Sequence, residues 1–344
     1  MKTAAAILVE QHKPLVLDEV EIPPLSTGQV LVQVKTSRIC GSQLGEIDGV
    51  KGPDRFLPHL LGHEGGGLVL ETGSDVTRVK AGDAVVLHWR PGAGLQVRPP
   101  VYQWGSRKVN AGWVTTFNQF AVVAENRLTP VPADFDLEFA ALLADTLTTG
   151  FGVINNDANV KIGESVVLFG CGGIGLGAIL GARLAGAHPI VAVDLFNHKL
   201  EKAREFGATH TVNASTCDAA AAIREIVGAA GADVVIDGTG QPRIIETCYQ
   251  LTHNKGRCVL FGVLPHDKSV TLHTLPLHFG RVLTGSEGGG SHPHLDIPRL
   301  VRMIQDGRFN PKGFISHRIK LAEVNDTIAK MRSGEVIHAL IHFD

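Results

Sequence analysis

The stretch that decides the fold reads SVVLFGCGGIGLGAI and covers residues 165–179. Its apolar start predicts a buried strand that ends at Gly170, and an apolar helical pattern follows. The glycines at 170, 172 and 175 form the pattern G-x-G-x-x-G, which is typical of a dinucleotide-binding turn between strand and helix. Gly170 allows the tight turn, Gly172 lets the backbone approach a pyrophosphate, and Gly175 lets helix and strand pack closely.

An acidic residue at the end of the next strand supports this interpretation. The segment PIVAVD ends in Asp194, 19 residues beyond Gly175. A carboxylate there accepts hydrogen bonds from the adenosine ribose and repels a 2′-phosphate, so the pattern favours NAD over NADP. An ordinary turn followed by a surface aspartate is the alternative. The residues predicted to bind the cofactor are Gly170, Gly172, Gly173, Ile174, Gly175, Asp194, Lys199 and Val263.

The pattern of apolar and polar residues changes near Leu143. Beyond it, segments such as ESVVLFG, ADVVIDG and GRCVLFG are apolar throughout, and amphipathic helical patterns separate them. Strands that are apolar on both faces predict a doubly wound parallel sheet, here over residues 147–289. The fold class is therefore α/β, with this sheet as the nucleotide-binding domain.

The chain on either side of this sheet has a different pattern. Residues 1–146 contain short alternating strands, such as QVLVQVKTS and FAVVAENRL, punctuated by Gly, Pro and Asp, which predict a mainly antiparallel domain. Residues 290–344 offer one helix at 298–305, a second at 321–331 and the strand IHALIHF. That segment is too small to fold alone, so we expect it to rejoin the first domain.

Composition limits the classes of function. The 344 residues fit two domains, and 44% hydrophobic with 19% charged residues are typical of a globular protein. A net charge of −2 predicts neither a nucleic acid nor a membrane partner. The first apolar stretch, Ala4–Val9, is too short for a membrane span or a secretory signal. Five scattered cysteines argue against a disulfide framework, so we expect a cytoplasmic protein.

Two further motifs carry the chemistry. The segment ICGS contains Cys40, and GHEGGG contains His63, 23 residues later. Either residue alone is more often structural. Together they resemble the catalytic-zinc signatures of the medium-chain zinc-dependent alcohol dehydrogenases. The resemblance extends to GWVTTFNQFAVVAENRL, the glycine-rich turn and KMRSGEVIHALIHF, and so covers almost the whole chain. It implies a GroES-like catalytic domain joined to a Rossmann domain.

The resemblance also implies roles for individual residues. It implies that Cys40, His63 and Asp145 bind one catalytic zinc, with Asp145 at the third ligand position, where many relatives have cysteine. A helix-capping aspartate is the alternative for Asp145. Glu64 would lie beneath the metal, and Ser42 would relay the hydroxyl proton. Residues 89–113 contain no cysteine, so the structural zinc of many relatives is not expected.

Several supporting positions depart from the family pattern. Gly41 occupies a position where many relatives have a basic residue that contacts the pyrophosphate. His338 occupies a position where relatives have a C-terminal arginine with a similar role. Gly45 replaces the histidine of the proton relay, so the final base of the relay is not identified. Gln43 replaces the aspartate that orients the zinc-binding histidine, although an amide can still accept a hydrogen bond from imidazole.

The function implied is reversible, NAD-linked oxidation of a secondary alcohol, polyol or sugar hydroxyl to a carbonyl, with zinc bound in the site. Segments such as EFGATHTVNAS also look like the branch that oxidises thiol adducts of formaldehyde. The alternatives are a zinc-free quinone or enone reductase and a non-catalytic nucleotide-binding protein. A basic lobe at residues 89–113 is either a solvated face or a lid over a polar substrate. The resemblance also implies a homodimer or homotetramer, because strands corresponding to those around Val270–Gly285 often pair across a two-fold axis in the family.

Overall fold

A computed structural model describes residues 1–344. The chain folds into two compact units. The first unit contains Met1–Asp145 together with His292–Asp344, and the second contains Thr146–Ser291. The C-terminal segment thus packs with the N-terminal one.

The second unit contains a six-stranded parallel sheet in the order β13-β12-β11-β14-β15-β16. Its strands are β11 Val166–Phe169, β12 Ile190–Asp194, β13 His210–Asn213, β14 Ala232–Asp237, β15 Thr252–Leu260 and β16 Val282–Gly285. This is the strand order of the doubly wound dinucleotide-binding fold, which confirms the predicted fold class. The order reverses beside β11, so a ligand site is expected at its carboxyl end.

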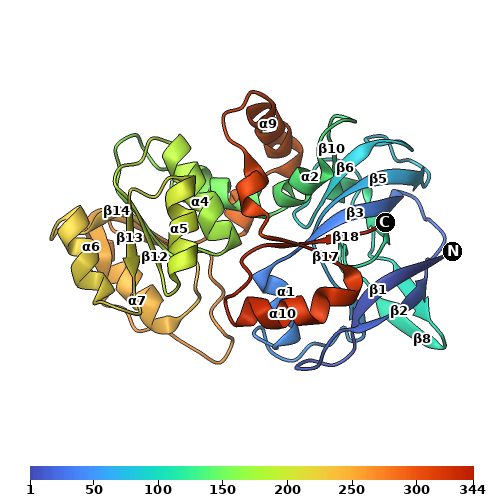
Figure 1. The fold of residues 1–344 in the computed structure, drawn as a ribbon, viewed down its shortest axis with the longest axis horizontal. Coiled ribbons are helices and arrows are strands. Elements are labelled where there is room, and N and C mark those ends of the chain that lie inside the picture. Colours follow the sequence, from blue (N-terminus) through green and yellow to red (C-terminus); the bar gives the residue numbers. More distant parts are fainter. The chain divides into compact units, whose positions relative to one another are not determined.

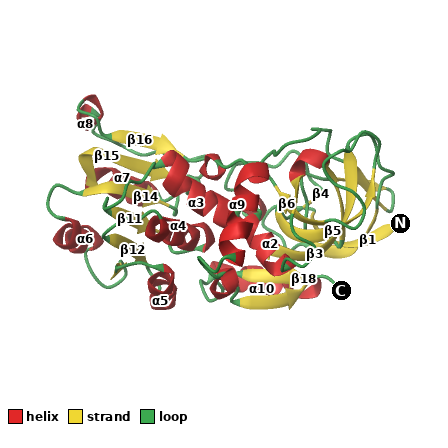
Figure 2. Cartoon of the chain, turned by 90° about the horizontal axis from the view of Figure 1, so that it is seen from above, coloured by secondary structure: helices red, strands yellow, loops and turns green.

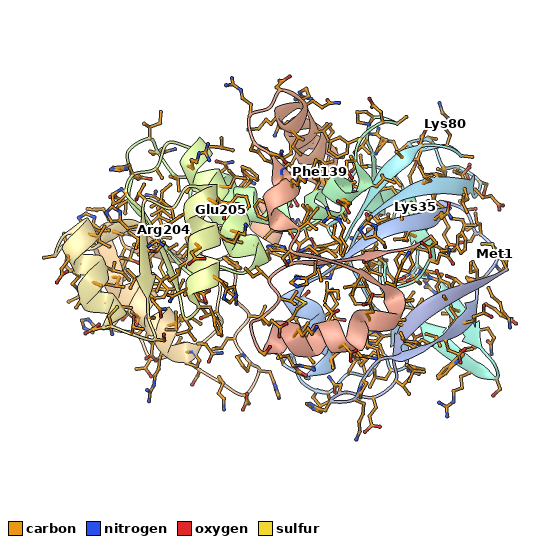
Figure 3. All side chains as sticks on the ribbon, in the orientation of Figure 1. Met1, Lys35, Lys80, Phe139, Arg204 and Glu205 are labelled. Atoms are coloured by element: carbon orange, nitrogen blue, oxygen red, sulfur yellow. The ribbon has the colours of Figure 1, made fainter.

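Helices cover both faces of this sheet. The crossover helices are α4 Gly173–Leu184, α5 Asn197–Phe206, α6 Ala219–Val227 and α7 Pro242–Leu251. The first of them, α4, is apolar and largely buried. Helices α4 and α5 lie next to each other, as do α6 and α7, and the two pairs flank the strands (Figure 2). On α5, Ala203 and Phe206 are buried, whereas Arg204 and Glu205 are exposed (Figure 3).

Shorter helical segments complete the second unit. They are α3 Thr146–Gly152, a π-helical turn at Val153–Asp157, α8 Leu275–His278 and a 3₁₀ turn at Gly288–Gly290. The β-branched core of the sheet, including Val167, Val191 and Val235, is fully buried. Burial of this apolar surface is the main stabilising term of the unit.

The first unit contains a closed barrel and a larger sheet, both mainly antiparallel, as predicted (Figure 1). The barrel order is β1-β2-β7-β8-β4, formed by β1 Lys2–Leu8, β2 Val16–Glu21, β7 Val101–Trp104, β8 Arg107–Asn110 and β4 His59–Leu60. The larger sheet runs β10-β6-β5-β3-β18-β17, and β9 pairs with β3. Its strands are β3 Gln29–Ile39, β5 Glu64–Thr72, β6 Ala84–His88, β9 Phe120–Ala124, β10 Leu128–Pro130, β17 His317–Lys320 and β18 Ala339–His342.

The helices of the first unit are α1 Gly41–Ile47, α2 Leu137–Leu143, α9 Pro293–Gln305 and α10 Val324–Arg332. Helix α9 begins five residues earlier than the expected start at Pro298, because Pro293 occupies its first turn and Pro298 lies inside it. The expected helix at 321–331 is a 3₁₀ turn, Leu321–Glu323, followed by α10. The last strand is shorter than the segment IHALIHF.

No single helix has the length and apolar composition needed to cross a membrane. Only a broken pair, Leu137–Leu143 with Thr146–Asp157, meets that criterion when its two parts are counted together.

Candidate active site

Four side chains of types that can bind a metal ion meet in the first unit. The ligand atoms of Cys40, His63, Glu64 and Asp145 all lie within 4.8 Å of one another. His63 Nε2 lies 3.6 Å from Asp145 Oδ2 and 3.8 Å from Glu64 Oε1. Ligands at ordinary zinc distances around a tetrahedral ion are about 3.3–3.8 Å apart. The donor types suit zinc, and the distance between His63 Nε2 and Asp145 Oδ2 falls in this range.

Strand pairing brings the first two of these residues together. Cys40 directly follows β3, and His63 directly precedes β5. The two strands are antiparallel, and the register that pairs Ser37 with Gly65 places the end of one beside the start of the other. Residues 23 positions apart in the sequence therefore share one site.

Helix α2 brings the third donor. Asp145 lies two residues beyond its last residue, Leu143. A β-carbon at Gly66 would lie 2.4 Å from the Leu137 carbonyl oxygen, so only glycine lets α2 pack this closely on β5. Glycine at position 66 is thus needed for the packing of the helix that precedes Asp145.

The cluster attracts positive charge. Burial alone would lower the pKa of His63, but Asp145 and Cys40 raise it well above its ordinary value. Cys40, Glu64 and Asp145 are each at most 6% exposed. Buried acidic groups that stabilise a proton on imidazole also stabilise a divalent cation at the same place.

Trp89 orients Asp145, a contact that the sequence did not indicate. Its indole Nε1 donates a hydrogen bond of 2.8 Å to Asp145 Oδ1, while Oδ2 faces His63. Trp89 directly follows β6, which is paired with β5. No local pattern distinguishes this tryptophan from a packing residue, because its partner lies 56 residues away.

Gln43 contacts His63 differently from the expectation. Its Oε1 accepts the backbone N–H of Cys40 at 2.7 Å, as part of a capping box at the start of α1. Its Nε2 therefore faces Nδ1 of His63 at 2.5 Å. The expected bond, from imidazole to the amide oxygen, is absent because the helix cap occupies that oxygen. Ser42, in the first turn of α1, lies 3.4 Å from His63 Nε2 through its Oγ.

Glu64 is paired with a buried arginine that the sequence did not single out. Arg38 Nη1 donates to Glu64 Oε1 at 2.5 Å, and Arg38 Nε donates to His338 Nδ1 at 3.0 Å. Burial alone would lower the pKa of Arg38, but the charges of Glu64 and Cys40 raise it. The sequence offered only a weak signal, because Arg38 is one of several polar residues in β3 and Lys35 of the same strand is also charged.

The glycine-rich turn of the second unit has the predicted geometry. Gly170 has a φ of +96°, a left-handed conformation that favours glycine. A β-carbon at Gly175 would lie 2.0 Å from the Gly170 carbonyl oxygen. A β-carbon at Gly172 would meet no protein atom within 4 Å, so protein packing does not require glycine there. Space remains at Gly172 for a ligand to approach the backbone.

The helix that follows the turn offers its N-terminus to an anion. Gly172 is the N-cap of α4, and Gly173 and Ile174 begin its first turn. No acidic residue lies in that turn, and no side chain caps it. The free N–H groups and the positive end of the helix dipole suit a phosphate.

Asp194 and Lys199 lie close to this turn. Asp194 ends β12, and its Oδ2 accepts the Cys171 N–H at 2.8 Å, which ties it to the glycine-rich segment. Lys199 is on α5, with Nζ 4.9 Å from the ring centre of Phe196. Val263, just beyond β15, is 56% exposed. The turn, the acidic residue and the exposed valine all belong to the second unit.

Comparisons with known proteins identify two domains of one family in the chain. Residues 26–133 match the alcohol dehydrogenase GroES-like domain, and residues 173–306 match the zinc-binding dehydrogenase domain. The chain is 30% identical to S-(hydroxymethyl)glutathione dehydrogenase of Paracoccus denitrificans, over 99% of this chain and 100% of that protein.

Two solved structures are also similar. Benzyl alcohol dehydrogenase of Acinetobacter calcoaceticus has a TM-score of 0.90 and 27% identity, with 100% of both chains covered. The 2R,3R-butanediol dehydrogenase of Bacillus subtilis has a TM-score of 0.80 and 26% identity, over 99% of this chain and 100% of that one.

The fold and the metal-binding cluster define a zinc-binding, nucleotide-linked dehydrogenase. The chain belongs to the medium-chain zinc-dependent alcohol dehydrogenase family. It is an NAD-dependent oxidoreductase that uses zinc and interconverts alcohols and carbonyl compounds.

Proposed function

We propose that this enzyme oxidises a secondary alcohol, polyol or sugar hydroxyl to a carbonyl, reversibly and with NAD. The observation that supports it most is the cluster of Cys40, His63 and Asp145, whose donor atoms come from three separate segments yet lie within 4.8 Å. Zinc, when bound, lowers the pKa of a substrate hydroxyl.

The chain's own residues have distinct proposed roles. Cys40, His63 and Asp145 hold the metal, and Trp89 fixes the carboxylate of Asp145 through its indole N–H. Three protein ligands leave a fourth position for the substrate oxygen. Ser42 Oγ, 3.4 Å from His63 Nε2, accepts the hydroxyl proton and passes it on. Glu64 stays beneath the metal, paired with Arg38.

The second unit is proposed to bind NAD. The glycine-rich turn and the N-terminus of α4 hold the pyrophosphate, and Asp194 binds the adenosine ribose. Lys199 and Val263 complete the proposed contacts at the carboxyl ends of β12 and β15. The carboxylate at 194 disfavours a 2′-phosphate, so NAD is preferred over NADP.

The substrate class rests on the aspartate ligand and on similarity to a butanediol dehydrogenase, whose named substrate is a secondary alcohol. The second candidate is a hydroxymethyl thiol adduct, which the similarity to S-(hydroxymethyl)glutathione dehydrogenase favours. Initial rates with NAD should be compared across short secondary diols, sugar alcohols, primary alcohols and S-(hydroxymethyl)glutathione. The proposal expects the largest kcat/KM with a secondary hydroxyl, and a clear preference for the thiol adduct would overturn it.

We also propose that the enzyme is a homodimer or homotetramer that pairs through β16. This strand is the edge of the parallel sheet, and exposed apolar side chains lie on it and just before it, among them Val282, Phe279 and Leu275. Exposed edges of this kind associate readily. Light scattering coupled to gel filtration tests this: a monomeric mass would refute it, and Val282→Lys should shift an oligomer toward monomer.

A further inference from the structure

A buried ion pair lies against the proposed metal site. Arg38 and Glu64 are 2% and 0% exposed, and Arg38 Nη1 lies 2.5 Å from Glu64 Oε1. A buried charge without a partner is strongly unfavourable, so neither group is tolerated there alone. The pair is therefore a unit, and its acidic member is also part of the metal-binding cluster.

The backbone holds the guanidinium in place. Arg38 is on β3, which lies between β5 and β18 in the sheet. The pairing of Ser37 with Gly65 places Arg38 beside Glu64, and Leu340 of β18 is its partner on the other side. Its Nε donates to His338 Nδ1 at 3.0 Å, so this imidazole accepts and adds no opposing positive charge through that nitrogen.

The charges of the loaded site balance only with Arg38 included. A thiolate at Cys40 and carboxylates at Asp145 and Glu64 carry three negative charges. Zinc supplies two positive charges, and Arg38 supplies the third. His63 binds zinc as a neutral ligand. In a buried site, where charges interact strongly, the Arg38 guanidinium gives the Glu64 carboxylate a counter-charge that is not the metal.

We propose that Arg38 is a positioning residue: its ion pair keeps the Glu64 carboxylate from becoming a fourth protein ligand. This rests on the ligand set proposed above. Glu64 Oε1 is 3.8 Å from His63 Nε2, near enough to reach a shared cation after a small movement. Without Arg38, Glu64 loses the guanidinium that pairs with it, and the cation becomes a competing counter-charge for its carboxylate. Coordination by Glu64 would then fill the position that substrate needs.

The test replaces zinc with cobalt(II) and measures the open position directly. Imidazole is added to the cobalt protein, and its apparent Kd is obtained from the change in visible absorption. For Arg38→Met we expect this Kd to rise at least about tenfold relative to wild type. Release of cobalt to a chelator should become slower, because a fourth protein ligand has been added.

A double variant separates positioning from a general structural role. Arg38→Met with Glu64→Gln removes both buried charges and leaves the loaded site neutral. Imidazole binding should return to within about threefold of wild type. A merely structural arginine predicts the opposite, with weak metal binding in Arg38→Met that the second substitution does not repair. That result, or an unchanged imidazole Kd in Arg38→Met, would overturn the proposal.

A conservative variant covers the case in which Arg38→Met does not fold. Arg38→Lys keeps the positive charge, but its side chain is shorter and lacks the planar guanidinium group. It should therefore raise the imidazole Kd severalfold. An unchanged Kd in Arg38→Lys, with Arg38→Met insoluble, counts against positioning. The wild-type cobalt spectrum tests the ligand set separately. The charge-transfer absorption from thiolate to cobalt should be present in wild type and lost in Cys40→Ala. If wild type lacks this absorption, the proposed ligand set is wrong.

Discussion

The indole N–H of Trp89 donates to Oδ1 of Asp145 at 2.8 Å, and Oδ2 of the same carboxylate lies 3.6 Å from His63 Nε2. One oxygen is thus occupied by a neighbour, and the other faces the cluster. A hydrogen bond of this kind fixes the orientation of a ligand before the metal arrives. The orientation of the Asp145 carboxylate therefore depends on Trp89, which is not itself a proposed metal ligand.

Trp89→Phe should weaken zinc binding while keeping most of the packing. The ring remains, but the donor to Asp145 is lost, and such supporting contacts are worth about 10–100-fold in metal affinity. Competition with a chromophoric chelator measures the change. Trp104→Phe is the matched control, because Trp104 donates the same kind of bond to Asp18 on an exposed surface. Equal zinc affinities in the two variants would rule out the orienting role.

Gln43→Glu should tighten zinc binding by about tenfold. A histidine that binds a cation through Nε2 carries its proton on Nδ1, which here faces the amide nitrogen of Gln43. A carboxylate of the same length accepts both this proton and the Cys40 N–H. Competition with the same chelator measures the change, with the exposed Gln241→Glu as a charge control. Weaker zinc binding in Gln43→Glu would show that the amide is already well placed.

Asp194→Asn should raise the KM for NAD about tenfold and reduce the preference for NAD over NADP. The amide removes the charge that repels a 2′-phosphate and weakens charge-assisted bonds to the ribose, each worth about 1.5–3 kcal/mol. Initial rates with both cofactors measure this. Asp218→Asn, at the N-cap of α6, is the control for a general effect on the unit. An unchanged cofactor preference would show that Asp194 does not bind the adenosine ribose.

Glu125 should make stability depend on pH. Burial alone would raise its pKa, but the N–H groups of Leu95, Thr77 and Arg78 outweigh burial and lower it. A carboxyl whose pKa is lower in the folded state adds stability above its unfolded pKa, about 4.5, and loses it as pH falls through the folded value. Glu125→Gln should therefore cost about 1–3 kcal/mol near neutral pH and much less in acid.

Urea unfolding of wild type and Glu125→Gln at about pH 7 and about pH 3.5 measures this difference. A gap that is the same at both pH values would show that the charge of Glu125 contributes nothing. The Leu95 N–H donates to Glu125 Oε2 at 2.8 Å, so the same carboxylate also holds the beginning of the cysteine-free segment 89–113 in place.

The sequence predicted the parts of the molecule that depend on local pattern. The turn at Gly170–Gly175 needs small residues at fixed spacing, and its geometry follows from them. Two supporting residues were not predictable, because their contacts join distant segments. Arg38 meets Glu64 across paired strands, and Trp89 reaches Asp145 over 56 residues. Pro298 predicted a helix start, but the helix continues through it from Pro293.

Zinc content tests the central claim most directly. Protein purified without added metal should contain about one zinc per chain by elemental analysis, as a single three-ligand site requires. Cys40→Ala and Asp145→Ala should each lose most of it, whereas Cys217→Ala, which removes an exposed cysteine, should keep it. Full zinc content in Cys40→Ala or Asp145→Ala, or no zinc in the wild-type protein, would contradict the proposed catalytic site.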